Sequence, residues 1–274
     1  MTTTLRPTEP LQQNADGTRS RHYQVCVNSR PVGTVHLGTS PAFGASVARI
    51  HELRIEEPDR RRGRGTVAAL AAEEVARGWG CREIEISVPG TAEAALRLVT
   101  ALGYVLRNRG MEKQLDDTPP TLPDGYRARP MTEADFETWQ AHEMEDYART
   151  WIDRGVPEAE ARAKSERDHE TLLPQGLGTK DMWFNILEHE GTRVGVLWLA
   201  LRDGKPFVYD VEVDADQRGH GHGRALMLLA ETQAHALGKR TIGLNVFADN
   251  TPAERLYESL GYETTRYAYY KRLL

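Results

Sequence analysis

A glycine-rich segment between an apolar run and an amphipathic run has the residue types that bind a phosphate. The apolar run covers residues 207–213 and predicts a strand, and the sequence after the segment predicts a helix. Glycines let the backbone turn tightly and approach an anion, while successive N–H groups and the positive end of a helix dipole stabilise its charge. The predicted anion-binding loop consists of Arg218, Gly219, His220, Gly221, His222, Gly223 and Arg224.

Other interpretations of this loop are less well supported. It lacks the Gly-Lys-Ser/Thr ending of a nucleotide-triphosphate loop, and its glycines do not follow the dinucleotide spacing. His220 and His222 could be metal ligands, but in a glycine loop after a strand we expect their N–H groups to contact the phosphate, and we predict no metal. Arg218 and Arg224 can add charge-assisted contacts.

A second strand and a second helix are predicted after the loop. Residues 241–247 have the apolar pattern of a strand. We expect Thr251 to be the N-cap of the following helix, with Pro252 at its first position and Glu254 three residues after the cap. Gly261 is expected to end this helix.

Two motifs occur in order in the second half of the chain. The first is Arg-x-x-Gly-x-Gly after a strand, and the second is Asn-x-x-Ala-x-x-x-Tyr-x-x-x-Gly-Tyr, which begins at Asn250. Together they make residues 125–274 resemble the GNAT superfamily of acyl-CoA-dependent N-acyltransferases. The resemblance implies acyl transfer, most simply from acetyl-CoA, to the amine of a small molecule or a peptide. It also implies that Asn250 and Ala253 contact the cofactor, although Asn250 could simply help to cap the helix.

The reaction that this resemblance implies is direct attack of an amine on an acyl thioester, with a proton donor for the departing thiolate. Tyr257 suits that task, because a phenol with a pKa of about 10 stays protonated at neutral pH. Glu212 could deprotonate the amine, and Asp210 lies on the same strand face. The structural alternatives are that Tyr257 only packs beside Leu256 and Leu260, and that both carboxylates are solvated.

Val211 and Val213 alternate with Glu212 along the predicted strand, so their side chains point to the other face. In the family, the backbone at these positions pairs with the pantetheine arm of the cofactor. Packing of the two side chains in the core is compatible with that role.

An acidic and aromatic segment precedes the hairpin of the second half, where the family typically covers its acceptor site. Spacings of four residues place its members on neighbouring faces of a helix that starts at the capping box Thr132-Glu-Ala-Asp. They could form a wall for a cationic amine, or a core-facing aromatic row with a solvated acidic back. The members are Trp139, His142, Glu143, Asp146, Tyr147 and Trp151.

An internal repeat divides the chain. Subtracting 158 from a residue number places Gly221 on Gly63 without a gap, and the flanking elements recur in the same order. The sequence therefore predicts two GNAT-like domains, 1–118 and 125–274, joined by a proline-rich linker at 119–124. Each is expected to be an α/β domain with a mixed, mostly antiparallel sheet flanked by helices.

The first domain is expected to be a degenerate copy that lacks an active site. Tyr257 corresponds to Val99, and Glu212 corresponds to Arg54. Its basic loop at residues 60–64 could hold a second acyl-CoA or could be solvated. The alternative from another class is a non-catalytic acyl-CoA-binding regulator with the first half as sensor. Within the enzyme class, the tandem arrangement is similar to that of mycothiol synthase.

Composition limits the other classes of function. The 274 residues carry a net charge of −5, which argues against general nucleic-acid binding. No apolar run has membrane-spanning length, and the N-terminus lacks a signal-peptide pattern. Cys26 and Cys81 show no metal-binding spacing, which favours a reducing cytoplasm. We expect partial disorder over residues 1–20, and a homodimer is possible.

Overall fold

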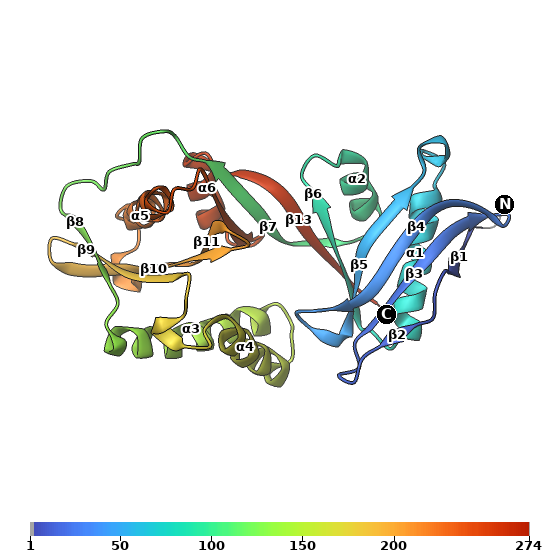
Figure 1. Cartoon of the computed structure of the whole chain (residues 1–274), viewed down its shortest axis with the longest axis horizontal. Helices are drawn as coiled ribbons and strands as arrows, with labels where there is room; N and C mark the ends of the chain where they lie inside the picture. Colours follow the sequence, from blue (N-terminus) through green and yellow to red (C-terminus); the bar gives the residue numbers. More distant parts are fainter. Residues whose placement is uncertain (1–2, 274) are drawn as a thin grey trace. The chain divides into compact units, whose positions relative to one another are not determined.

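The computed structural model describes residues 3–273. Their contacts divide the chain into two compact units (Figure 1). The first unit consists of Met1–Gly110 with Thr264–Leu274, and the second unit consists of Met111–Glu263.

The first unit is a mixed sheet with two helices packed on one face. β5 and β6 pair in parallel, whereas the pairs β1–β3, β3–β4, β4–β5 and β6–β13 are antiparallel. Its apolar core lies between the sheet and the helices α1 and α2. The elements are β1 (Thr3–Pro7), β2 (Gln12–Gln13), β3 (Arg19–Val27), β4 (Arg30–Ser40), β5 (Gly44–Ile55), α1 (Arg64–Gly78), β6 (Glu83–Pro89), α2 (Glu93–Ala101), the start of β7 (Val105–Gln114) and nearly all of β13 (Glu263–Arg272).

The second unit has helices on both faces of its sheet, which Figure 1 shows with α5 above the strands and α3 and α4 below them. The strand order is β12-β11-β10-β9-β8, with the end of β7 beside β12. β11 and β12 pair in parallel, whereas the pairs β10–β11, β9–β10 and β8–β9 are antiparallel. The elements are β8 (Tyr126–Pro130), α3 (Glu133–Asp153), α4 (Glu158–Leu172), β9 (Met182–His189), β10 (Thr192–Arg202), β11 (Lys205–Val213), α5 (His222–Ala236), β12 (Thr241–Phe247) and α6 (Thr251–Ser259).

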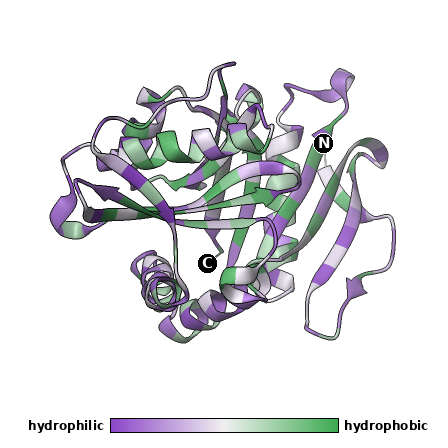
Figure 2. Ribbon diagram, turned by 60° about the vertical axis from the view of Figure 1, so that its left-hand side comes forward, coloured by the Kyte–Doolittle hydropathy of each residue, from purple (hydrophilic) through white to green (hydrophobic). Residues whose placement is uncertain are grey.

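Two apolar cores result from this layering. One lies between the sheet and the helices α5 and α6, and the other lies under α3 and the end of α4. Figure 2 shows that hydrophobic stretches concentrate on strands and on helix faces, whereas loops and hairpin tips are mostly hydrophilic. The predicted α/β tandem fold, with mixed and mostly antiparallel sheets, is confirmed.

Each unit takes a strand from the other half of the sequence. The end of β7 belongs to the second unit, where Lys113 Nζ lies 2.8 Å from Glu231 Oε2. Nearly all of β13 belongs to the first unit, where Lys271 Nζ lies 2.7 Å from Glu73 Oε2. Both glutamates are fully buried. The units therefore differ from the domains 1–118 and 125–274 in the assignment of these two strands.

The repeat is visible in the backbone of both units. Gly63 precedes α1 with φ 72°, and Gly221 precedes α5 with φ 87°. Both glycines are in the left-handed region, which residues with a Cβ atom adopt at a cost. Tyr104 and Tyr262, which also correspond, are both buried.

Two local predictions are wrong. The stretch expected to be partly disordered contains β1, which pairs with β3 from Thr3 opposite Val27 onward, so its backbone is ordered by ladder hydrogen bonds. The N-cap of α6 is Asn250 and not Thr251, because Asn250 Oδ1 accepts a hydrogen bond from Ala253 N at 3.2 Å.

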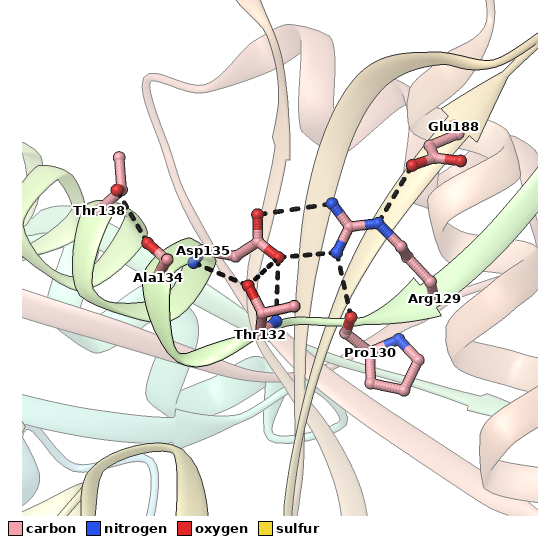
Figure 3. A network of polar contacts seen from close by, with 7 residues as sticks. All are labelled: Arg129, Pro130, Thr132, Ala134, Asp135, Thr138 and Glu188. Atoms are coloured by element: carbon pink, nitrogen blue, oxygen red, sulfur yellow. Dashed lines mark hydrogen bonds and ion pairs between the residues drawn. The ribbon is translucent and has the colours of Figure 1, made fainter.

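A polar network fixes the start of α3 on the sheet (Figure 3). The predicted capping box is present: Asp135 N donates to Thr132 Oγ1 at 3.2 Å, and Thr132 N donates to Asp135 Oδ2 at 2.9 Å. Arg129 of β8 lies 2.7 Å from Asp135 and 3.1 Å from Glu188 of β9. The Arg129 guanidinium holds the pKa of Asp135 well below its usual value.

We predict that Thr132→Ala lowers the free energy of unfolding by about 1 kcal/mol, because an N-cap oxygen is lost. Urea denaturation followed by tryptophan fluorescence measures this change. Thr138→Ala is the matched control on the same helix, since the Thr138 hydroxyl only donates back to Ala134 O. Alanine is the better helix former there, so no loss is expected. Equal losses for both variants would contradict the proposed role of the cap.

Candidate active site

Strands β11 and β12 separate before the glycine loop. Their pairing consists of Phe207 with Gly243 and Val208 with Leu244 in the described chain. Residues 209–213 of β11 therefore have polar backbone groups without a strand partner on the β12 side. Such groups need another hydrogen-bonding partner, either water or a ligand.

A β-bulge in β11 accompanies this separation. Asp210 lies opposite Trp198 of β10, and the next pair skips Tyr209. A bulge bends its strand and increases the local twist. Tyr209 stacks on Trp198 with 4.7 Å between ring centroids, while Trp139 Nε1 donates to Asp210 Oδ2 at 3.2 Å. Two consecutive side chains of β11 thus face the core under α3.

The predicted anion-binding loop leads directly into α5. Gly219 has φ 83° and Gly221 has φ 87°. A Cβ atom at either position would meet no atom within 4 Å, so the backbone conformation, and not crowding, requires glycine there. At Gly223 a Cβ atom would lie 3.1 Å from Leu256 Cδ2, so this glycine allows close packing against α6.

The backbone donors of this loop are free. Within residues 3–273, the N–H groups of residues 218–223 donate to no protein acceptor, and the first intrahelical bond of α5 runs from Arg224 N to Gly221 O. A run of free N–H groups at the positive end of a helix dipole stabilises a bound anion. The loop therefore has the donors that a phosphate group requires.

The arginines of the loop differ in their contacts. Arg218 is exposed, and its Nε donates to Val213 O at 3.3 Å. Arg224 Nη2 donates to Ser259 Oγ at 2.7 Å, which connects the start of α5 to the end of α6. Only Arg218 therefore has its guanidinium NH2 groups free of protein partners in the described chain.

The histidines of the loop point to different partners. His220 Nδ1 lies 3.2 Å from Gln217 O on the exposed side. His222 is buried, and its Nδ1 lies 2.7 Å from the Tyr126 hydroxyl. Burial lowers the pKa of His222, and its neutral form can then share a hydrogen bond with Tyr126. Each histidine side chain has a structural role, while the backbone N–H group of the same residue remains free to bind an anion.

The other residues predicted to bind the cofactor lie on either side of the separation. Val211 and Val213 pack against the core under α5, whereas Glu212 faces α3, as the alternation predicts. Asn250 accepts from Ala253 N and so caps α6. The structure thus shows that Asn250 caps α6. Contact of Val211, Val213, Asn250 and Ala253 with a cofactor stays a prediction.

Tyr257 packs in the core, and its role as a proton donor stays a prediction. Its ring packs in the core beside Leu256 and Leu260, and the residue is 8% exposed. Its hydroxyl forms no hydrogen bond with any described residue. Burial raises the pKa of Tyr257 to about 12, with a further contribution from the charge of Asp210. The phenol is therefore protonated and available as a donor at neutral pH.

Four carboxylates gather between α3 and β11. His142 Nε2 lies 3.3 Å from Asp146 Oδ2 and 3.2 Å from Glu212 Oε1. Ligand atoms of these three residues lie within 4.8 Å of one another, close enough to hold a cation. The four carboxylates are Glu143, Asp146, Asp210 and Glu212.

Burial and mutual repulsion shift the protonation of this group. Burial is the main cause that raises the pKa of Glu143 to about 9, and Asp210 and Glu212 raise it further. Burial also raises the pKa of Asp210 to about 7, although the hydrogen bond from Trp139 acts to lower it. The hydrogen bond with Glu212 raises the pKa of His142 and favours its protonated form.

Sequence reasoning left open whether the acidic helix forms a wall or a packed row, and the structure shows parts of both. Trp139 and Trp151 are 3% and 7% exposed and face the core. Glu143 and Asp146 interact with the carboxylates of β11. Trp139 and Asp210 are 71 residues apart, and nothing in the sequence indicated a hydrogen bond between them. The one related sequence feature was the spacing of four residues between Trp139 and Glu143.

The first unit keeps the bulge but not these side chains. Its bulged residue in β5 is His51, which stacks on His36 at 4.6 Å, and His36 stacks on His22 at 4.0 Å. Val99 fills the position that corresponds to Tyr257 and is 1% exposed. In its basic loop, Arg64 is buried and ion-paired with Asp59. His51 thus corresponds to Tyr209, Arg54 to Glu212 and Val99 to the phenol, whereas Glu52 keeps a carboxylate at the position of Asp210.

We predict that Glu143→Gln stabilises the protein more at pH 9 than at pH 5. A carboxyl whose pKa is raised on folding stabilises the fold below its unfolded pKa of about 4.3, and this contribution is lost as pH rises to the folded pKa. The gain in free energy of unfolding from Glu143→Gln should be larger at pH 9 than at pH 5 by at least about 1 kcal/mol. Denaturation of both proteins at each pH measures this gain. Glu137→Gln, at an exposed position of α3, should show no such difference.

Comparison with known proteins agrees with this geometry. The model of the acetyltransferase (GNAT) family matches residues 2–104 and 133–262. An uncharacterised N-acetyltransferase of Bacillus subtilis, YdgE, is 32% identical over 149 residues, which are 52% of this chain and 95% of that protein. The mycothiol acetyltransferase of Thermomonospora curvata is 30% identical over 253 residues, which are 86% of this chain and 76% of that protein.

A solved structure shares the tandem arrangement. It is a tandem GNAT protein from the clavulanic acid biosynthesis pathway, with a TM-score of 0.54 and 20% identity, covering 94% of this chain and 84% of that one. This likeness concerns the fold alone. Since the family model matches both halves of the sequence, and a relative matches most of its length, the chain belongs to the GNAT family of acetyltransferases.

Proposed function

We propose that the second unit transfers an acyl group, most simply acetyl, from acyl-CoA to a primary amine. The observation that carries this proposal is the run of free N–H groups at residues 218–223, which lies beside the separated strands β11 and β12. The loop supplies donors for a diphosphate, and the strand edge supplies backbone groups for an extended amide-containing arm. Coenzyme A has both features.

The residues of the second unit fit this co-substrate. Arg218 and the backbone from Gly219 to Gly223 would hold the diphosphate, and the backbone of Val211 and Val213 would align the arm. Asn250 and Ala253 lie at the start of α6, on the far side of the separation. Acyl-CoA, when bound, supplies an acyl group activated as a thioester.

The protein's own groups then move two protons. The nitrogen of the neutral amine forms a bond to the acyl carbon, and the bond from carbon to sulfur breaks. Tyr257 donates its hydroxyl proton to the departing thiolate, and a carboxylate removes the proton from the nitrogen. Much of the acceleration comes from holding the two reactants in place.

Two carboxylates are candidates for the base. Glu212 is on the strand before the loop and hydrogen-bonded to His142. Asp210 influences the pKa of Tyr257, and its own pKa of about 7 suits a base at neutral pH. The amine would reach either one from the side of α3, directly or through water.

The compartment and the acceptor are also proposals. Cys26 and Cys81 are both free and buried, which supports a reducing cytoplasm. In residues 3–273, no helix combines the length and apolar character that crossing a bilayer requires. The extended similarity to mycothiol acetyltransferases makes an acceptor related to theirs the second candidate within the same chemistry.

A thiol-release assay with acetyl-CoA and a panel of amines tests the proposed reaction. The expected result is release of coenzyme A that depends on an amine and yields the N-acetyl product. Binding of acetyl-CoA without turnover for any amine would instead support a non-catalytic acyl-CoA-binding regulator.

We predict that Tyr257→Phe lowers turnover at least tenfold and leaves the affinity for acetyl-CoA within a few-fold, because the sulfur loses its proton donor. Steady-state kinetics and calorimetry measure the two quantities. Tyr262→Phe is the matched control, since its ring lies 6.0 Å from that of Tyr257 in the same core. Unchanged turnover in Tyr257→Phe would remove this residue from the mechanism.

We predict that Gly221→Ala weakens acetyl-CoA binding at least tenfold. A Cβ atom disfavours the backbone conformation at φ 87°, so the loop would present its N–H groups differently. Gly204→Ala carries the same kind of strain at φ 75°, also in open space, at the β10–β11 turn. Calorimetry should show a loss for Gly221→Ala only. An equal loss in both would indicate a global effect.

A further inference from the structure

We propose that the acceptor is an amine that carries a second positive charge, such as a diamine, held between α3 and β11. This proposal rests on the proposed acyl transfer and adds the class of acceptor. The reacting nitrogen lies beside Asp210 and Glu143, and the second ammonium group lies beside Asp146 and Glu212.

The first argument is that these four carboxylates share a single cationic neighbour. Among residues 3–273, no lysine or arginine forms an ion pair with any of them, and His142 is their one cationic neighbour. Lys164 of α4 is bound to Asp168 at 2.5 Å, and Tyr147 donates to the same carboxylate.

The rest of the same helices shows the opposite pattern. Glu145 lies 2.6 Å from Arg162 and 3.0 Å from Arg149. Asp135 is held by Arg129, as described above. Carboxylates on the outer side of α3 are therefore neutralised by arginines, whereas those facing β11 are not. Like charges gathered around a single counter-charge destabilise a fold, and a cationic ligand would relieve this repulsion.

The second argument is the phenol beside the cluster. Tyr257 is more than nine-tenths buried, has no hydrogen-bond partner among the described residues, and is close enough to Asp210 for that charge to affect it. The side chain is buried, but its hydroxyl oxygen is not fully enclosed by the protein, so the group is available to a ligand. It marks the deep end of the cluster as the place where the reacting groups meet.

The cluster extends outward from that point. Trp139 and Glu143 are one helical turn apart on α3, and Trp139 is bonded to Asp210. His142 and Asp146 are the next such pair, and both contact or lie near Glu212. The carboxylates thus form a deep pair and an outer pair. Two positive charges on one ligand balance two such pairs better than a single ammonium group does.

Three amines with a four-carbon chain test the proposal in the full-length enzyme with acetyl-CoA. Putrescine has a second ammonium group, n-butylamine has a methyl group at that end, and γ-aminobutyrate has a carboxylate. We expect kcat/KM for putrescine to exceed that of butylamine at least tenfold, with γ-aminobutyrate lowest, and the difference to appear mainly in KM. Added salt should reduce the preference.

Variants on α3 locate the effect. Asp146→Asn should reduce the preference for putrescine over butylamine at least fivefold, whereas Glu137→Gln on the exposed side of the same helix should preserve it. Comparable kcat/KM values for the three amines would overturn this inference while leaving the proposed acyl transfer intact. So would a preference that disappears on addition of a chelator, since His142, Asp146 and Glu212 would then hold a metal ion.

If no amine supports turnover, calorimetry tests the proposed acceptor class by ligand binding alone. Putrescine that binds the acetyl-CoA-saturated protein more tightly than butylamine, in a manner that Asp146→Asn weakens, would support the acceptor class while the proposed reaction fails. Equal binding of the two amines would overturn the inference.

Discussion

The bulge at Tyr209 is the constraint on which the second unit depends. It interrupts β11 directly after Val208, the last residue of β11 that pairs with β12, and the two strands then separate as the chain approaches the glycine loop. An unpaired strand edge inside a sheet is unfavourable unless something else satisfies its polar groups. The same bulge turns Tyr209 and Asp210 to one face, which places the carboxylates opposite the backbone groups that would hold the co-substrate.

The two faces of the sheet consequently have different chemistry. Toward α5 and α6 lie apolar side chains, free backbone N–H groups and the positive end of a helix, which suit an anion with an extended arm. Toward α3 lie four carboxylates that form no ion pair with a lysine or arginine of the described chain, which suits a cation. Tyr257 lies on α6, and its pKa responds to Asp210, so it connects the two faces at the place where acyl transfer would occur.

Much of this could be predicted from the sequence, because the strands, the loop and α6 are local patterns with definite turn and cap residues. The periodicity gave the faces of Glu212 and Val213 correctly. What the sequence could not show depends on contacts between distant residues, such as Trp139 with Asp210 or His142 with Glu212. The error at the start of α6 has a similar origin, since Asn250 and Thr251 are both good caps and only the backbone decides between them.

The exchange of strands between the units has a consequence for how the duplicated chain can change. The segment after Gly110 completes the second unit, and the segment after Glu263 completes the first. Cutting the peptide within 119–124 would therefore leave two fragments that each still lend a strand to the other's core. Neither half could be deleted, or inherited as a separate gene, without removing the lysine that pairs with a buried glutamate in the remaining half. Loss of the first half of the sequence would thus leave the buried Glu231 of the second unit without its lysine partner.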